Sequence, residues 1–175
     1  HVCDHLVVMR RMPADRWLSA LVKANETLEA RLDSLVDLLV GFHRRAERSP
    51  AADEAAGVDA LAGLWSDNSD ALAGFDDLLD ADAIETVDLL AHRYLDGRRA
   101  LFETRVSSGR ACDGHGDLLA DDIFFPEDSP TVLDCLEFDD ALRLGDVLAD
   151  IAFLAMDLER LGRRDLAARL LATYR

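Results

Sequence analysis

The segment DGHGDLLADD, residues 113–122, decides the fold expected of this chain. Its two glycines flank His115 and indicate a tight loop. The apolar run 123–125 follows, then a turn cluster, Pro-Glu-Asp-Ser-Pro, and then a second apolar run at 131–133. Two short apolar runs separated by a turn predict an antiparallel β-hairpin.

This hairpin is expected to bring two carboxylates together. Asp122 precedes the first strand and Asp134 follows the core of the second, so pairing about a turn centred near Asp128 places them opposite each other. Adjacent carboxylates repel each other unless a cation lies between them, and Mg²⁺ favours a few carboxylates together with substrate phosphates. The sequence therefore predicts that Asp122 and Asp134 bind Mg²⁺, while Asp117, on the same loop, contacts a hydroxyl group.

Helices are predicted on both sides of the hairpin, which makes the expected fold mainly α with a small β-hairpin. Apolar residues recur at steps of three and four, the spacing of amphipathic helices. The expected helices span residues 13–24, 58–79, 82–106, 146–161 and 164–174, with a short strand over 5–12. A further helix is expected to follow a cap at Asn25 or Thr27 and to end near Arg48. Within this pattern, residues 49–57 are expected to form a loop, and Ser66-Asp67-Asn68-Ser69 to break the third helix.

Composition excludes some classes of partner. The net charge of −16 argues against nucleic acid and against an anionic membrane surface. No apolar run approaches the roughly 20 residues that span a bilayer. The three cysteines lack a CxxC spacing and indicate reduced thiols, so a cytoplasmic location is expected.

The loop also has the spacing of a kinase catalytic loop. Protein kinases carry His-Arg-Asp-x-x-x-x-Asn, where the Asp is the base and the Asn binds magnesium. Here residues 115–117 read His-Gly-Asp, and Asp122 takes the position of the Asn. On the segments 113–118, 133–138 and 145–154 the chain resembles the aminoglycoside phosphotransferase/choline kinase family, and most closely bacterial bifunctional aminoglycoside phosphotransferase/ATP-binding proteins.

The resemblance implies a role for each acid of the segment. Asp117 matches the catalytic Asp, and Asp134 matches the metal-binding Asp after the hairpin. Asp122 departs from the usual Asn but remains a magnesium ligand. Leu119 replaces a His that many relatives carry, so any role of that His is absent here.

Four further residues are assigned roles, three of them near these acids in the sequence. His115 is expected to brace the loop backbone, and Asp146 to tie the loop down, although an acid at a helix start is also an ordinary cap. Glu137 is equally compatible with supporting the metal and with being an exposed strand-end acid. His43 follows an apolar stripe and is expected to be packed in the core.

The resemblance further implies a domain organisation. The lone lysine, Lys23, lies in a predicted helix, and neither GxGxxG nor GxxxxGK[ST] occurs. The N-lobe that grips ATP is therefore expected to be absent, and the chain alone to be inactive. Residues 1–12 would be the last N-lobe strand and the hinge, with Met9 and Arg10 at the nucleotide, and residues 13–175 a helical, kinase-like C-lobe with catalytic loop 113–122 and metal-binding hairpin 123–138.

The function expected on this basis is an ATP- and Mg²⁺-dependent phosphotransferase that acts on a small hydroxylated acceptor. Its parent chain would also carry the N-lobe and a P-loop domain. One alternative is a regulatory or binding kinase-like module without catalysis, attached to an ATPase domain. Another is a helical domain whose acidic loop binds a metal for stability alone.

Overall fold

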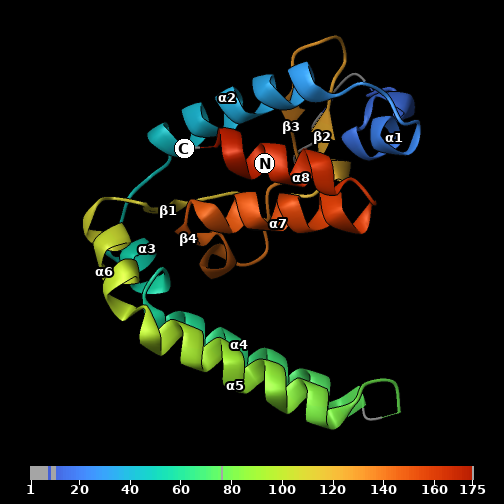
Figure 1. The fold of residues 1–175 in the computed structure, drawn as a ribbon. Coiled ribbons are helices and arrows are strands. Elements are labelled where there is room, and N and C mark those ends of the chain that lie inside the picture. The colour runs from blue at the N-terminus through green and yellow to red at the C-terminus, as the bar shows by residue number, and fades with distance from the viewer. Residues whose placement is uncertain (1–7, 9–10, 76, 175) are drawn as a thin grey trace, which may run out of the picture. The chain divides into compact units, whose positions relative to one another are not determined.

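The computed structural model describes residue 8, residues 11–75 and residues 77–174. Over these residues the chain is mainly α-helical and has two small antiparallel sheets of two strands each (Figure 1), which confirms the expected mainly α class. The helices are α1 (Leu18–Lys23), α2 (Glu29–Arg45), α3 (Pro50–Ala55), α4 (Val58–Leu72), α5 (Ala81–Gly97), α6 (Arg99–Ser107), α7 (Leu148–Arg160) and α8 (Arg164–Thr173). The strands are β1 (Ala111–Asp113), β2 (Ile123–Phe124), β3 (Thr131–Val132) and β4 (Leu144–Asp146).

The chain divides into two compact units. Unit 1 comprises the chain up to Gly41, Leu118–Asp134, and the chain from Ile151 onward. Unit 2 comprises Phe42–Asp117 and Cys135–Asp150. Both units are therefore assembled from separate stretches of sequence.

Unit 1 contains the main hydrophobic core. The leucine stripe of α2 is fully buried, with Leu32, Leu35 and Leu39 between 0 and 2% exposed, because a spacing of three and four places these side chains on one helix face. The stripe packs against α1, the β2–β3 hairpin, α7 and α8. The partners include Leu18, Leu21, Ile123, Phe125, Ile151, Leu154, Leu158, Leu166 and Leu170.

The β2–β3 hairpin lies where the sequence predicts it, with a register one residue away from the expected one. Ile123 pairs with Val132, and the N–H of Leu133 donates to the Asp122 carbonyl at 3.0 Å. Leu133, not Asp134, therefore lies opposite Asp122. The turn is centred between residues 127 and 128 instead of on residue 128, which shifts the pairing by one position.

Unit 2 has a smaller core and a long helical pair. Strand β1 pairs antiparallel with β4, and Ala111 packs with Ala52 and Ala56 in a core of small side chains. Helices α4 and α5 run side by side (Figure 1). Residues 110–122 read as a loop in the sequence, whereas the structure has strand β1 within them.

The helices differ from the sequence predictions in three places. Residues 49–57 contain α3, because Ser49 caps it by accepting the N–H of Ala52 at 3.1 Å, and a proline is favourable in the first turn. Helix α4 continues through Ser66 and Ser69, whose hydroxyls bond to α5 instead of to their own backbone. The expected helix over 82–106 is two helices, α5 and α6, which meet at Arg98, directly after the glycine at 97 that interrupts its apolar stripe.

Other expectations fall in part outside the described residues. The strand over 5–12, with Met9 and Arg10, lies mostly there; Val8 is described and is 94% exposed.

In the described part of the chain, no helix has both the length and the apolar character needed to cross a membrane. Cys112 and Cys135 are free thiols, and burial raises the pKa of Cys112 to about 11.

Candidate active site

A buried carboxylate on α7 holds the His-Gly-Asp loop. Asp150, 5% exposed, accepts the backbone N–H of His115 at 2.9 Å and that of Gly116 at 3.0 Å. His43 Nε2, itself 3% exposed, lies 3.0 Å from the same carboxylate. The histidine is thus a core residue, as expected, but one that bonds to the group anchoring the loop.

The environment of Asp150 keeps it ionised. Burial raises the pKa of this carboxyl group, but hydrogen bonds from His43 and from the N–H groups of His115 and Gly116 outweigh burial, so its pKa lies below the ordinary value. A buried carboxylate that accepts several hydrogen bonds holds their donors in fixed positions. The backbone just before Asp117 is therefore rigidly placed.

The loop requires glycine at positions 114 and 116, because neighbouring atoms leave no room for a Cβ there. A Cβ at Gly114 would lie 2.9 Å from Asp150 Oδ2. Gly116 has φ +83°, and a Cβ there would lie 3.0 Å from the carbonyl oxygen of Leu142. The Gly-His-Gly sequence thus allows the loop to lie against both the anchoring acid and the 142–143 backbone.

We expect Gly116→Ala to destabilise the protein by at least about 1 kcal/mol, because alanine is strained at positive φ and meets the neighbouring backbone. Gly63→Ala is the control: Gly63 is inside α4 with nothing within 4 Å of its added Cβ, so this change should stabilise by about 0.5–1 kcal/mol. Urea unfolding monitored by circular dichroism measures both. Equal effects of the two changes would contradict the close approach at Gly116.

The segment after Asp134 packs onto the other side of the loop. Arg143 donates to Asp113 Oδ1 at 2.8 Å and to the Leu136 carbonyl at 2.9 Å. The N–H of Leu136 in turn donates to the His115 carbonyl at 3.1 Å. The His115 backbone is therefore held through both its N–H and its carbonyl.

Asp117 itself is left available. Its side chain is half-buried, and no described residue forms a hydrogen bond or an ion pair with its carboxylate. A partly desolvated carboxylate on a fixed loop is suited to accept a proton from, or orient, a bound hydroxyl group.

In unit 1, Asp122 has a structural role that was not foreseen. Its Oδ2 accepts the N–H of Leu119 at 2.9 Å and closes the short 3₁₀ turn Ala120–Asp122. The same turn is held by Asp157, 1% exposed, which accepts the N–H of Ala120 at 2.9 Å. Asp122 is thus fixed in place, with one carboxylate oxygen engaged by the backbone.

Asp134 lies at the end of the hairpin in an unusual conformation. It is exposed and has φ +64°, the left-handed region that non-glycine residues seldom adopt. Aspartate tolerates this region better than most residues, but the conformation still costs free energy and is typical of functional positions. Its carboxylate forms no hydrogen bond or ion pair with the described residues.

The described residues contain no group of three or more His, Cys, Asp or Glu side chains that could hold a metal ion. A structural metal site made of protein ligands alone is therefore not found in this part of the chain. Magnesium at nucleotide sites is held by one or two carboxylates together with phosphate oxygens. The chemistry of Asp122 and Asp134 fits that kind of ion, and their binding of Mg²⁺ stays a prediction.

Asp146 was expected to tie the His-Gly-Asp loop down, but Asp150 holds this loop instead. Asp146 bonds to Arg105 Nη2 at 2.7 Å and caps α7 through the N–H of Leu148 at 2.8 Å. The signal for Asp150 was in the sequence: Asp150, Leu154 and Asp157 follow helical spacing and share the buried face of α7. Glu137 is exposed, and no described residue pairs with it.

The chain is similar to bacterial proteins of greater length. It is 42% identical over 172 residues to an uncharacterised protein of Mycobacterium bovis and to one of Mycobacterium tuberculosis. The match covers 98% of this chain and 34% of each relative, so the chain spans about a third of their length. No family model matches the chain, and no solved structure is significantly similar to it.

Proposed function

We propose that this chain is the catalytic lobe of a kinase-like phosphotransferase, which transfers the γ-phosphoryl group of ATP to a hydroxyl of a small molecule. The observation that supports this most strongly is the anchoring of the His-Gly-Asp loop by Asp150. An ordinary surface turn needs no buried carboxylate and histidine to hold it. A catalytic loop does, since phosphoryl transfer depends mainly on positioning.

The proposed roles belong to three carboxylates, Asp117, Asp122 and Asp134. Asp117 orients the acceptor hydroxyl and takes its proton as that oxygen attacks the γ-phosphorus and ADP leaves. Asp134 and Asp122 would hold Mg²⁺ together with nucleotide phosphates, and the ion would supply positive charge to offset the charge that develops during transfer. The strained backbone of Asp134 is consistent with a ligand held in place for function.

A regulatory kinase-like module is the second candidate. The observation in its favour is the use of one Asp122 oxygen by the N–H of Leu119. This hydrogen bond competes with metal binding at the position where kinases carry Asn. In that case the nucleotide site would have lost turnover and would serve to regulate a neighbouring domain.

Two single substitutions in the full-length polypeptide test the metal assignment. Asp134→Asn should weaken Mg²⁺-dependent nucleotide binding at least about tenfold, because it removes a charged ligand while asparagine still tolerates the left-handed conformation. Asp122→Asn should be tolerated, since the amide oxygen can still accept the Leu119 N–H and bind magnesium. Calorimetric titration of nucleotide at several Mg²⁺ concentrations measures both.

A larger loss of Mg²⁺-dependent nucleotide binding in Asp122→Asn than in Asp134→Asn would overturn the assignment of the metal ligands. Nucleotide binding that is indifferent to Mg²⁺ in the unsubstituted polypeptide would exclude the phosphotransferase proposal in this form. Mg²⁺-dependent binding without transfer to any hydroxyl acceptor or water would favour the regulatory module.

A further inference from the structure

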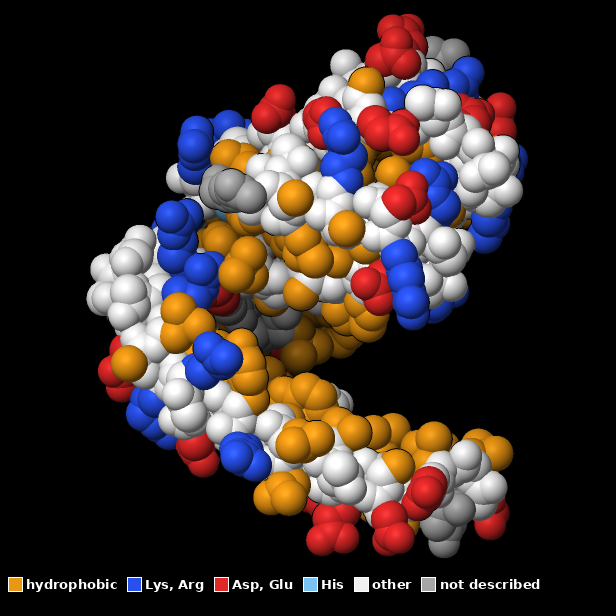
Figure 2. Space-filling view, viewed as in Figure 1, with side chains coloured by type: hydrophobic (Ala, Val, Ile, Leu, Met, Phe, Trp, Pro, Cys, Tyr) orange, Lys and Arg blue, Asp and Glu red, His pale blue; other side chains and the backbone are white. Residues whose placement is uncertain are grey.

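The α4–α5 pair carries an apolar face that nothing else described in unit 2 covers. Its large side chains are 40–55% exposed, far above the level of core residues. Figure 2 shows hydrophobic side chains along one edge of this pair. They are Trp65 and Leu72 of α4 and Val87, Leu90 and Tyr94 of α5, here named the exposed stripe.

Helix geometry explains why the exposed stripe is continuous. The two helices meet along a polar seam, where Ser69 Oγ donates to Asp88 at 2.8 Å and Ser66 Oγ lies 3.3 Å from His92 Nε2. Trp65 directly precedes Ser66 of the seam on α4, and Val87 directly precedes Asp88 of the seam on α5. In an antiparallel pair, these positions fall on the same side of the seam.

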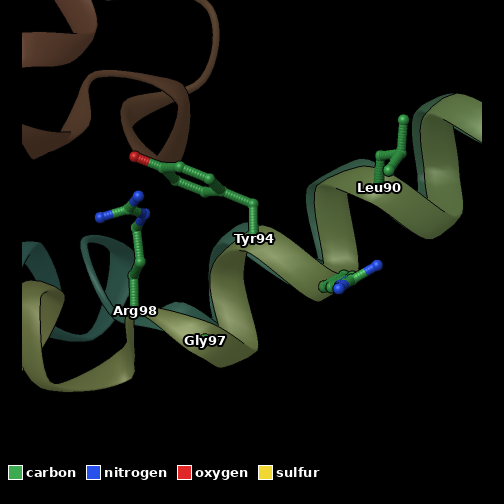
Figure 3. Close-up of a pocket in the computed structure, with 5 residues that line it drawn as sticks. Leu90, Tyr94, Gly97 and Arg98 are labelled. Atoms are coloured by element: carbon green, nitrogen blue, oxygen red, sulfur yellow. The ribbon is translucent and has the colours of Figure 1, made fainter.

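The exposed stripe has a surface that a second helix can enter. Arg98 lies over the Tyr94 ring, 4.7 Å from its centroid, and Leu90 lies one turn away on the same side of α5 (Figure 3). Leu90, Tyr94 and Arg98, with Arg93 and Gly97, line a shallow hollow. A side chain on a crossing helix can enter such a hollow.

Charge indicates which helix would enter it. The first half of α5 and its N-cap carry Asp80, Asp82 and Glu85, whereas the second half carries Arg93 and Asp96 and is followed by the C-cap Arg98. Arg99, also in this region, is already paired within the chain with Asp59 at 2.9 Å and Asp96 at 3.7 Å. Two copies of α5 crossing antiparallel would therefore place the acidic half of each beside the basic half of the other.

We propose that the exposed stripe is the interface of a homodimer, in which two α5 helices pack antiparallel about a two-fold axis near Leu90. A two-fold contact needs a surface that is complementary to itself, and α5 meets this condition in both shape and charge. In this arrangement Val87 of one copy packs beside Tyr94 of the other. The net charge of −16 opposes an anionic membrane as the occupant of this face.

Sedimentation equilibrium of the full-length polypeptide at micromolar concentration tests the proposal, and a dimer is expected. Leu90→Glu should raise the dimer dissociation constant at least about tenfold without changing helicity or thermal stability, because this side chain is 55% exposed in the single chain. Leu89→Glu is the matched control: Leu89 is 66% exposed but follows Asp88, on the other side of the seam, so the dimer should persist.

Arg98→Glu gives a second measurement, since it places a negative charge beside the acidic half of the partner helix and should weaken the dimer several-fold. A monomeric polypeptide would overturn the proposal. So would equal effects of Leu90→Glu and Leu89→Glu on the dimer. A monomer that is strongly destabilised by Leu90→Glu would show instead that another part of the same polypeptide covers the face.

Discussion

Replacing Asp117 by asparagine in the full-length polypeptide should lower kcat by about 10²–10⁴-fold and leave nucleotide affinity nearly unchanged. The half-buried carboxylate has no partner among the described residues, so its removal breaks no hydrogen bond or ion pair to them. Its loop is held through backbone groups of His115 and Gly116, which the substitution does not alter. Steady-state rates and nucleotide titrations on the same preparation separate chemistry from binding.

The matched control for Asp117→Asn is Asp113→Asn. Asp113 lies on the same segment but is paired with Arg143 at 2.8 Å, so its loss should affect stability more than kcat. If Asp117→Asn abolished metal-nucleotide binding while Asp134→Asn left it intact, the roles of base and ligand would be the reverse of those proposed.

Removing the loop anchor should have the largest effect on stability. We expect Asp150→Ala to cost about 3–5 kcal/mol, because His43 and two backbone N–H groups would remain buried without their acceptor. Turnover of the full-length polypeptide should fall as well, since the loop that carries Asp117 loses its support. Asp146→Asn, which removes a charge from the Arg105 pair, should cost only about 1 kcal/mol.

The pH dependence of stability checks the origin of the Asp150 effect. The pKa of this carboxyl group is lower in the folded protein than its ordinary value of about 4. Its stabilising contribution is therefore complete above that value and is lost as the pH falls through the lower, folded pKa. Urea unfolding at pH 7, 4 and 3 measures the free energy of unfolding of the unsubstituted protein and of Asp150→Ala. The difference between these two free energies should become smaller in acid. A difference that stays constant would contradict an ionic role of Asp150.

The sequence predicted those features that local pattern determines. Helices α2, α7 and α8 follow from apolar spacing, and the β2–β3 hairpin follows from two apolar runs around a turn. Strand β1 could not be found in this way, because its three residues pair with β4, whose first residue lies more than 30 positions later in the chain. Short strands formed by distant pairing leave little local signal.

The sequence predicted the site only in part, because local pattern did not determine every contact of the loop. The His-Gly-Asp motif marked the loop, but the choice between Asp146 and Asp150 as its anchor depended on which acid faces inward. Helical spacing with Leu154 favours Asp150, whereas proximity to the helix start favours Asp146 as a cap. Only the hydrogen bonds to His115 and Gly116 decide between them.

The discontinuous assembly of unit 1 has a consequence for synthesis on the ribosome. The α2 stripe is covered by α7 and α8, yet more than 110 residues separate Leu39 from Ile151. At about 5–20 residues per second, a nascent chain would present these leucines to the surroundings for roughly 6–20 s before their partners emerge. During that interval the α2 leucines would offer an apolar surface to holding chaperones, and slower decoding between residues 40 and 150 would lengthen the exposure.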